Sequence, residues 1–378
     1  MSTPRDFGFD QDALTLKEAA HDYLQDQLRA GLLLELVKTV ERDPRATLPD
    51  GRLQQDIMSL GWNGLAIASD EGGVGASFPA IVGVAEELGR SAAPIPLLST
   101  LIACQLLQQC HTDAAREVRK AVAGGATVTL AFADQRSSQH CRDTRVRFED
   151  GRLKGIAWFV QDGCQADWYL VAAKDASGIG WYAVPADDQD IDIIADDIAD
   201  LTRTQARIEC NAVAGGRSRC LVAQGEGIDC FEKALPGILA ISAADMAGAA
   251  EWLLQTTTDY ARTRTQFGVS IGSFQAVKHP LVDLMIMIDQ ARSLAYATAG
   301  AISAGADDAM RLARMAKEAA SEAAGFSVRT AIQLHGGIAY TWECAVHIFA
   351  KRQKHSQMLF GGGAAQREAL ARMLLDGN

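Results

Sequence analysis

Arg264-Thr-Gln-Phe-Gly268 and Gln333-Leu-His-Gly-Gly337 decide the fold of this chain, because each follows a long helical pattern of alanine, leucine and methionine. Four such patterns follow one another: residues 235–262, 275–303, 307–334 and 341–360. Pro236 and Pro280 are the only prolines in this part of the sequence, so the helices can be long, about 20 residues each. We therefore predict a four-helix bundle for residues 227–378.

The sequence before residue 227 changes its periodicity once. Helical spacing of apolar residues recurs in the first part, in these segments: residues 14–36, 53–60, 78–88 and 97–107. Short alternating stretches follow, and Asp150-Gly151 between two of them is typical of a two-residue β-hairpin turn. We therefore predict an α+β protein with an N-terminal helical domain (1–122), a central β-domain (123–226) and the C-terminal bundle (227–378).

Composition restricts the classes of partner and compartment. A net charge of −11 disfavours nucleic acid and anionic membranes as partners. The apolar stretch 235–254 contains Asp245 and Glu251, so we interpret it as a buried helix rather than a membrane span. The first residues do not have the pattern of a secretory signal, and the eight cysteines lack metal-ligand spacing. These features predict a cytoplasmic protein with free thiols and no metal site.

The motifs of the chain, taken in their order, resemble those of the acyl-CoA dehydrogenase family over nearly its whole length. The resembling segments are residues 60–65, 71–75, 86–90, 158–160, 264–268, 274–275 and 333–337. No single motif is decisive, but their order and spacing are specific. The resemblance implies a flavoprotein oxidoreductase of lipid metabolism with FAD as cofactor. It also implies an acyl-CoA substrate and an electron acceptor such as electron-transfer flavoprotein.

The C-terminal matches are implied to contact an FAD that is held mainly by a neighbouring subunit. A guanidinium can form two hydrogen bonds to pyrophosphate oxygens, and glycines let backbone N–H groups approach a phosphate closely. The residues with this implied cofactor role are Arg264, Gln266, Phe267, Gln275, Gln333, Gly336 and Gly337. A cofactor shared in this way implies an oligomer, and we expect a tetramer.

The segments expected to hold the chain's own flavin depart from the family pattern. Trp158 keeps an aromatic surface for the flavin, although a tryptophan in a strand could equally be a core residue. Val160 replaces a threonine whose hydroxyl would bond the flavin ring, and a valine side chain offers neither donor nor acceptor. Residues 132–136 stand where the family has a Thr-Glu-Pro segment and a Gly-Ser-Asp turn.

The catalytic base is the second departure. Desaturation of an acyl-CoA removes a weakly acidic proton beside the thioester, a task suited to a desolvated carboxylate. The family often places a glutamate after an aromatic residue near the end of the last long helix, where this chain has Gly361. Other relatives use the first C-terminal helix, where Ile238 stands at the matching position. Asp245 remains as a candidate base, or as a buried acid paired with an arginine.

Three functions are compatible with this pattern. The first is an FAD-dependent acyl-CoA dehydrogenase component that desaturates the α,β bond, as a homo- or heterotetramer with a second dehydrogenase-like chain. Heteromeric relatives include enzymes of steroid degradation. The second is a non-catalytic subunit that completes the FAD site of its partner. The third is a flavin monooxygenase-like relative, which needs no base for an α-proton.

Histidines and a basic run offer weaker candidates. His279 and His335 lie within the motifs, and we interpret both as hydrogen-bonding residues that hold position. Residues 351–355 carry Lys351, Arg352 and His355. This basic run could meet the phosphates of CoA, but a solvated helix face explains it as well.

Overall fold

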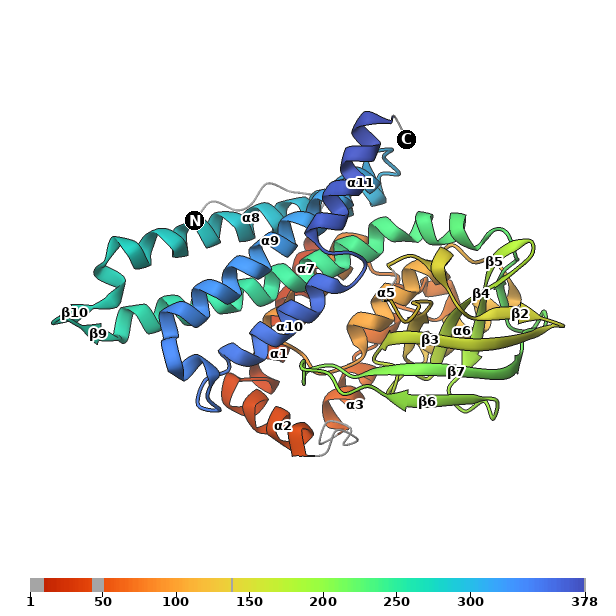
Figure 1. Ribbon diagram of the computed structural model, residues 1–378, viewed down its shortest axis with the longest axis horizontal. Helices are drawn as coiled ribbons and strands as arrows, with labels where there is room; N and C mark the ends of the chain where they lie inside the picture. The colour runs from red at the N-terminus through yellow and green to blue at the C-terminus, as the bar shows by residue number, and fades with distance from the viewer. Residues whose placement is uncertain (1–9, 43–50, 137–138, 377–378) are drawn as a thin grey trace.

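The computed structural model describes residues 10–42, 51–136 and 139–376. Helices come first, a β-sheet follows, and a second set of helices ends the chain (Figure 1). This order confirms the predicted α+β class with an N-terminal helical, a central β and a C-terminal helical part. The exact division at residues 122 and 226 stays a prediction.

The N-terminal part consists of helices that pack beside the sheet. They are α1 (Gln11–Gln27), α2 (Ala30–Arg42), α3 (Arg52–Ser59), α4 (Phe78–Arg90), α5 (Leu97–Leu107) and α6 (Asp113–Ala123), with short 3₁₀ turns η1 (Trp62–Gly64) and η2 (Ser69–Glu71). The helical pattern predicted over residues 14–36 is divided between α1 and α2. The break falls at Leu28, whose φ of −125° and ψ of 43° are not helical. Apolar spacing continues across this break, so periodicity alone could not reveal it.

The central part is an eight-stranded sheet with the order β6-β7-β3-β2-β4-β5-β8, and β1 pairs with β4. The strands are β1 (Val128–Ala131), β2 (Arg147–Glu149), β3 (Arg152–Gln161), β4 (Trp168–Asp175), β5 (Gly178–Pro185), β6 (Ile191–Ala195), β7 (Gln205–Ala214) and β8 (Cys220–Val222). The 3₁₀ turn η3 (Cys141–Asp143) precedes β2. Asp150 and Gly151, at φ of 50° and 74°, form the predicted two-residue turn between β2 and β3.

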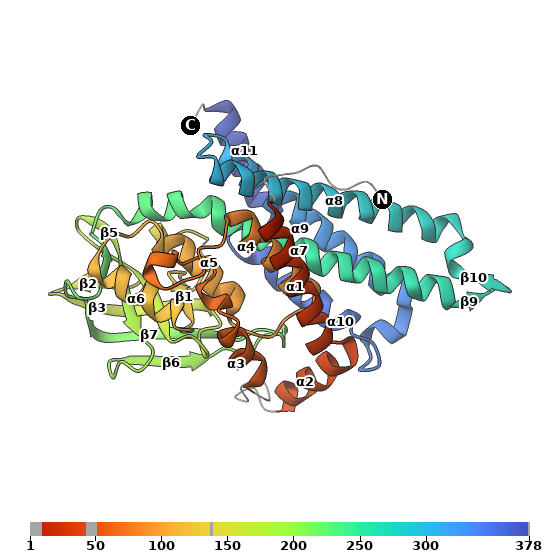
Figure 2. The same ribbon diagram turned by 180° about the vertical axis from the view of Figure 1, so that it is seen from behind.

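Both faces of the sheet are covered. In β4, Leu170 and Ala172 belong to the core shared with α4, α5 and α7, while Tyr169 and Val171 belong to a second core on the other face. Successive strand residues point to opposite faces, so this alternation follows directly from the strand geometry. Figure 2 shows α5 and α6 beside the sheet, with α1 and α4 between the sheet and the long C-terminal helices.

The C-terminal part contains the predicted helices, of which α7 is longer and α10 shorter than predicted. They are α7 (Gly227–Thr263), α8 (Gln275–Ser303), α9 (Ala309–His335), α10 (Val346–Met358) and α11 (Gly363–Leu375), with the hairpin β9 (Thr265–Gln266) and β10 (Val269–Ser270) and the 3₁₀ turns η4 (Ile271–Ser273) and η5 (Gly336–Tyr340). Pro236 and Pro280 lie inside α7 and α8 without ending them, so α7 reaches 37 residues. The four predicted helices are present, and α11 is an addition.

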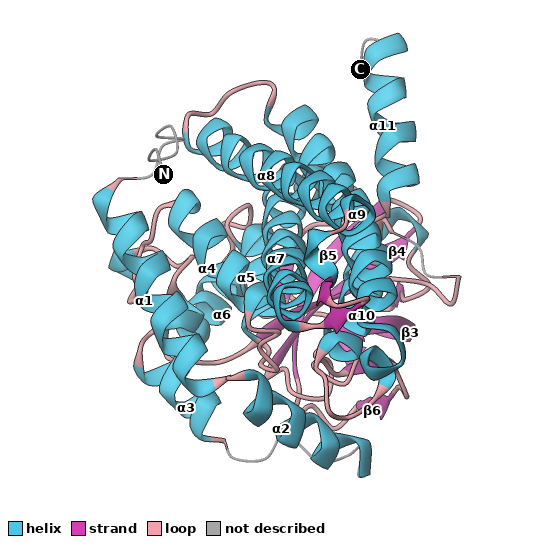
Figure 3. Ribbon diagram, turned by 90° about the vertical axis from the view of Figure 1, so that its left-hand side faces the viewer, coloured by secondary structure: helices cyan, strands magenta, loops and turns pink. Residues whose placement is uncertain are grey.

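Helix α7 joins the parts of the molecule. Seen end-on in Figure 3, α7 lies among the helices, and it contacts α4 and α9. Gly89 of α4 and Gly248 of α7 permit the close crossing, because a Cβ on Gly89 would collide with the carbonyl oxygen of Asp245 and one on Gly248 with that of Glu86. Helix α7 is long and apolar enough to cross a membrane, but its most apolar segment is largely buried in the protein. It is therefore a core helix, as predicted for residues 235–254.

Candidate active site at the junction of sheet and bundle

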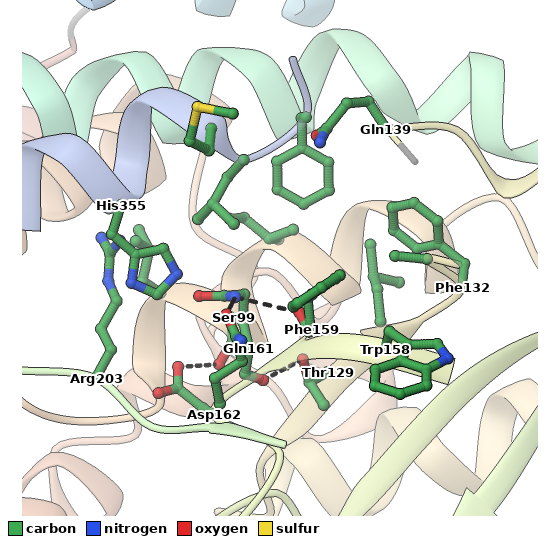
Figure 4. Close-up of a pocket in the computed structure, with 18 residues that line it drawn as sticks. Ser99, Thr129, Phe132, Gln139, Trp158, Phe159, Gln161, Asp162, Arg203 and His355 are labelled. Carbon is green, nitrogen blue, oxygen red and sulfur yellow. Dashed lines mark hydrogen bonds between the residues drawn. The ribbon is translucent and has the colours of Figure 1, made fainter. Parts of the chain in front are cut away.

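A cavity of about 130 Å³ lies where β3, α5 and the C-terminal end of α10 meet (Figure 4). We call it the junction pocket. Its apolar lining consists of Leu98, Ile102, Leu130, Phe132, Ala133, Trp158, Phe159, Met358, Leu359 and Phe360, and its polar lining of Ser99, Thr129, Gln139, Gln161, Asp162, Arg203, Gln205 and His355. The pairing of β3 with β7 shifts register between Ala157 and Val160, and this irregularity shapes the part of the pocket lining that β3 forms. Phe159 has φ of 54° there, and such bulges redirect side chains beside active sites.

Asp162 is the one carboxylate among the described residues that line the junction pocket. It lies just after β3 with 4% exposure, and its Oδ2 accepts a hydrogen bond of 2.7 Å from the Ser99 hydroxyl. Burial raises the pKa of Asp162, although the Ser99 hydrogen bond and the positive charge of Arg203 oppose that shift. Asp162 lies two residues after the Trp158–Val160 motif, and this proximity is the sequence signal that could have identified it.

Asp245 lies outside the junction pocket, in a buried ionic network behind Arg203. Its Oδ1 accepts from Arg352 Nη2 at 2.6 Å, and its Oδ2 accepts from Arg203 Nη2 at 2.7 Å. Burial alone would raise the pKa of Asp245, but the two guanidinium groups hold that pKa below its ordinary value. A carboxylate held in two ion pairs is a poor proton acceptor, so these contacts favour a structural role over the predicted base.

The basic run on α10 is only partly solvated. Arg352 is 1% exposed and belongs to the ionic network, so a solvated helix face is wrong for this residue. Lys317 of α9 joins the same region, where its Nζ donates to the carbonyl oxygen of Ser356 at 2.9 Å near the end of α10. Burial lowers the pKa of Lys317 to about 7. The network therefore fixes the end of α10 against α7 and α9, and so positions that wall of the junction pocket.

His355 points from α10 into the junction pocket (Figure 4). Its Nδ1 lies 3.3 Å from Asp200 Oδ2, and Asp200 is 1% exposed at its side chain. Burial opposes ionisation of Asp200, but the contact with His355 and the charges of Arg203 and Arg352 lower the pKa of Asp200. The sequence analysis missed this arrangement, because Asp200 and Arg203 lie in an irregular segment without a recognisable motif.

Two predicted residues have unexpected surroundings at this end of the molecule. Trp158 lines the junction pocket, and the guanidinium carbon of Arg207 lies 5.0 Å from its ring centroid, so one face of the indole already has a cationic neighbour. Gly361 is absent from the pocket lining, and its backbone N–H donates to Gln139 Oε1 at 2.8 Å. Its φ of 88° favours glycine, and a Cβ would lie 3.0 Å from Gln366 Nε2.

The other predicted cofactor residues lie at the opposite end of the long helices. The β9–β10 hairpin projects there (Figure 1), and the His335 ring stacks on Tyr260 at a centroid distance of 4.4 Å. This stack places residues 333–337 beside residues 264–268, and we call the two segments together the bundle tip. The structure thus brings the two motifs together but separates them from Trp158 and the junction pocket within one chain.

Polar side chains at and beside the bundle tip are exposed and have few partners among the residues that the structure describes. Within the described ranges, the side chains of Arg264, Gln275 and Gln333 form no hydrogen bond or ion pair. Gln266 Nε2 donates only to the neighbouring carbonyl of Thr265, at 2.8 Å. A guanidinium and several amides thus face outward together, which is the donor set that a pyrophosphate would need.

The presence of glycine at residues 336 and 337 of the bundle tip has two different explanations. Gly336 has φ of 65° and ψ of −141°, a conformation that is essentially restricted to glycine. Gly337 has no positive φ, and a Cβ built on it would meet no atom of the described residues within 4 Å. Nothing in the described part of the chain therefore requires glycine at residue 337. A close approach from outside the chain would explain it.

An apolar surface surrounds the bundle tip. Phe267, at the turn of the β9–β10 hairpin, is 92% exposed, and Tyr340 is 70% exposed. Helix α8 adds Val282, Met285 and Ile286, each between 48% and 57% exposed. Exposed apolar patches of this kind mark contacts with other proteins.

Comparisons with known proteins agree with this architecture. Residues 11–123 match the acyl-CoA dehydrogenase N-terminal domain, and residues 225–375 match the acyl-CoA dehydrogenase C-terminal domain. The chain is 31% identical over 315 residues to the acyl-CoA dehydrogenase IpdE2 of Mycobacterium tuberculosis, with 83% of this chain and 82% of that protein covered. It is 28% identical over 373 residues to the probable acyl-CoA dehydrogenase FadE25 of the same species, with 94% and 95% covered.

A solved structure has the same arrangement of parts. A chain of the ChsE4–ChsE5 complex from Mycobacterium tuberculosis superposes with a TM-score of 0.85 at 26% identity, and 98% of each chain is covered. The helical–β–helical order, the bundle tip and the two domain matches lead to one conclusion. The chain belongs to the acyl-CoA dehydrogenase family and is an acyl-CoA dehydrogenase-like oxidoreductase.

Proposed function

We propose that this chain is one subunit of a heteromeric, FAD-dependent acyl-CoA dehydrogenase that desaturates the α,β bond of an acyl-CoA thioester. The observation that carries the proposal is the bundle tip, where Arg264 and Gln333 are exposed and form no hydrogen bond or ion pair with the described residues of their own chain. A pyrophosphate is a dianion, and charge-assisted bonds from a guanidinium are the stronger kind of hydrogen bond. These residues, with Gln266, Phe267, Gln275, Gly336 and Gly337, would contact the FAD of an adjoining subunit.

A second chain fits the surface of this one. The exposed Phe267, Met285 and Ile286 would be buried in an oligomer, and burying one such side chain stabilises by about 1.5–3 kcal/mol. The ChsE4–ChsE5 complex is a structural neighbour that contains two different chains. Another structural neighbour, the Tcur3481–Tcur3483 steroid acyl-CoA dehydrogenase, superposes with a TM-score of 0.85 at 25% identity. It is the basis for proposing a role in steroid degradation, with a tetramer in the cytoplasm and electron-transfer flavoprotein as acceptor.

The junction pocket would take the acyl group and the flavin ring. Bound FAD supplies the two-electron acceptor for desaturation. The pocket volume of about 130 Å³ is below the roughly 300–1,000 Å³ of ligand sites, and Phe159, Leu359 and Phe360 are among the side chains that line it. Lining side chains would therefore move when ligands bind. Phe159 and Phe360 both have positive φ, at 54° and 55°, so each lies in a backbone conformation unusual for its type.

The base for the α-proton would come from the partner chain. Asp245 is held by two arginines, and Gly361 carries no side chain. Asp162 faces the pocket, but its Oδ2 is engaged by Ser99. A non-catalytic subunit is the second candidate function. The small pocket and the Arg207 guanidinium over Trp158 favour it, since both reduce the space for a flavin in this chain.

Co-purification with a second dehydrogenase-like chain tests the proposal. Arg264→Ala should weaken retention of FAD by about 10–100-fold, because a hydrogen bond to a charged group contributes about 1.5–3 kcal/mol. Arg262→Ala is the matched control: it removes another exposed arginine two residues earlier, in the last turn of α7, one that pairs with Asp259. Flavin absorbance per mole of assembly is the measurement.

The same preparation separates the two candidate functions. Two flavins reduced by substrate for each pair of unlike chains would indicate that this chain holds its own flavin, whereas one would support the non-catalytic subunit. Equal flavin content in Arg264→Ala, Arg262→Ala and the unchanged assembly would contradict a role of the bundle tip in FAD binding.

A further inference from the structure

Two buried polar atoms in the wall of the junction pocket have no hydrogen-bond partner. They are Gln161 Oε1 and His355 Nε2, which come from β3 and α10. Figure 4 shows both side chains directed into the pocket. Buried polar atoms in native proteins are nearly always satisfied, so an unsatisfied pair that faces one cavity indicates a ligand group between them.

The orientation of the Gln161 amide is fixed by a carboxylate. Asp196 Oδ2 can only accept, and it receives the side-chain N–H of Gln205 at 2.9 Å. Gln205 Oε1 must then face Gln161, whose Nε2 donates to it at 3.1 Å and to the carbonyl of Phe159 at 3.2 Å. Both hydrogens of Gln161 Nε2 are thus engaged, and Oε1 is left as an acceptor directed at the pocket.

A second carboxylate lies beside the His355 ring and favours one orientation of its proton by charge. Asp200 Oδ2 lies 3.3 Å from Nδ1, which favours the tautomer that carries its hydrogen on Nδ1. In that neutral tautomer Nε2 is an acceptor. Asp200 is itself held by Thr202, whose hydroxyl donates to Oδ1 at 2.7 Å. Two acidic residues behind the wall therefore present two acceptors to an otherwise largely apolar pocket.

We infer that the junction pocket selects an acyl group that carries a hydroxyl, with Gln161 Oε1 and His355 Nε2 as the alternative acceptors for its hydrogen. The inference rests on the proposed function, because it assumes that the acyl group enters this pocket. A plain hydrocarbon would leave both acceptors buried without a donor. A ketone would not satisfy the two acceptors either, because its oxygen can accept a hydrogen bond but cannot donate one.

A charged donor would fit these acceptors less well than a neutral one. An ammonium group could donate to both, but burying a charge costs more than burying a hydroxyl unless the charge is paired. The one carboxylate among the described lining residues, Asp162, already accepts from Ser99 and is influenced by the positive charge of Arg203. A neutral hydroxyl has no such penalty, and the apolar walls formed by Leu98, Ile102 and Leu130 suit the carbon skeleton that would carry it.

Binding of inert CoA thioethers tests the inference without turnover. S-octyl-CoA is compared with analogues in which one hydroxyl, or one ketone, is moved carbon by carbon along the inner carbons of the octyl group, leaving out the carbon bonded to sulfur and the terminal carbon. Calorimetry on the flavin-loaded assembly gives the dissociation constants. At one position the hydroxyl should bind about tenfold more tightly than S-octyl-CoA, since it alone satisfies a buried acceptor. The ketone at that position should bring no gain.

Variants identify the acceptors through the ratio of hydroxyl to plain affinity within each protein. Gln161→Leu and His355→Phe should each lower this ratio, and the double variant should bring it to about one. Gln255→Leu, an exposed glutamine of α7, is the matched control and should keep the full ratio. Asp196→Asn leaves Gln161 in place but lets the Gln205 amide turn, so the preference for hydroxyl over ketone should shrink.

The outcomes are distinct. Tight binding of S-octyl-CoA with no hydroxyl preference at any position would overturn this inference and leave the proposed function intact. Failure of every thioether to bind the flavin-loaded assembly would overturn the proposed function as well. Loss of flavin from Gln161→Leu and His355→Phe, with a flat thioether series, would assign the two acceptors to the cofactor and also overturn the inference.

Discussion

The bundle tip and the junction pocket carry polar groups in opposite ways. At the bundle tip, Arg264 and Gln333 are exposed and unpaired among the described residues of the chain, and Gly337 has no reason within it to be glycine. In the junction pocket, Asp162 and His355 are held by buried neighbours. One region is thus built for something outside the chain, whereas the other is built by the chain around a space of its own.

The largest expected effect comes from a substitution in the buried ionic network behind the junction pocket. Asp245→Asn removes the carboxylate that neutralises Arg203 and Arg352, and leaving a buried charge unpaired costs about 3–5 kcal/mol. Chemical denaturation of the isolated chain should show that loss in the free energy of unfolding. Asp259→Asn, on an exposed turn of the same helix, should change it by less than about 0.5 kcal/mol.

The stability lost in Asp245→Asn should depend on pH in a defined direction. The folded pKa of Asp245 is lowered relative to an unfolded value of about 3.9, so its contribution is fully present above that pH and disappears as the pH falls through the folded pKa. The difference in the free energy of unfolding between the unchanged chain and Asp245→Asn should therefore become smaller below about pH 4. A stable Asp245→Asn chain that has lost only turnover would restore Asp245 as the base.

The sequence was a good guide to the fold where local chemistry decides structure. Asp150-Gly151 predicted its hairpin because a two-residue turn needs positive φ at both residues, and both have it. It was a poorer guide where tertiary contacts decide. The apolar spacing of residues 14–36 continues through the break at Leu28, and α7 continues through Pro236 because the surrounding helices hold it in place.

The two regions of the candidate site differ in the same respect, because one could be predicted from local sequence and the other depends on tertiary contacts. The bundle tip lies in two contiguous motifs, so its residues could be named from the sequence, although their roles stay predictions. The junction pocket gathers side chains from α5, β3, α10 and an irregular segment. Of its lining, the sequence analysis named Trp158, the segment that begins at Phe132, and His355, the last only as part of a basic run. The significance of His355 depends on Asp200, which is distant in the sequence. No spacing rule connects such a pair before the chain is folded.

A pair of glycine substitutions sharpens the comparison. Gly248→Ala would drive a Cβ into the Glu86 carbonyl where α4 crosses α7, and we expect a loss of about 1–3 kcal/mol in the free energy of unfolding. Gly337→Ala meets no atom of the chain, so the isolated protein should keep its stability. In the two-chain assembly, however, Gly337→Ala should reduce flavin content, measured by absorbance. Equal flavin content would show that nothing approaches Gly337 closely.

The smallest expected effect tests whether the junction pocket would be a complete catalytic site if a base were added at residue 361. Gly361→Glu and Gly361→Gln share a left-handed φ of 88° and the approach to Gln366 Nε2, so both should lose about 1–2 kcal/mol of stability. The two differ only in the carboxylate. Because Gly361 does not line the pocket, we expect acyl-CoA dehydrogenation by the two assemblies to be equal, as measured by reduction of an artificial electron acceptor. A well-placed base contributes roughly 10²–10⁴-fold. A gain of that size for glutamate over glutamine would show that this chain retains a complete acyl and flavin cleft, in which the partner need not supply the base.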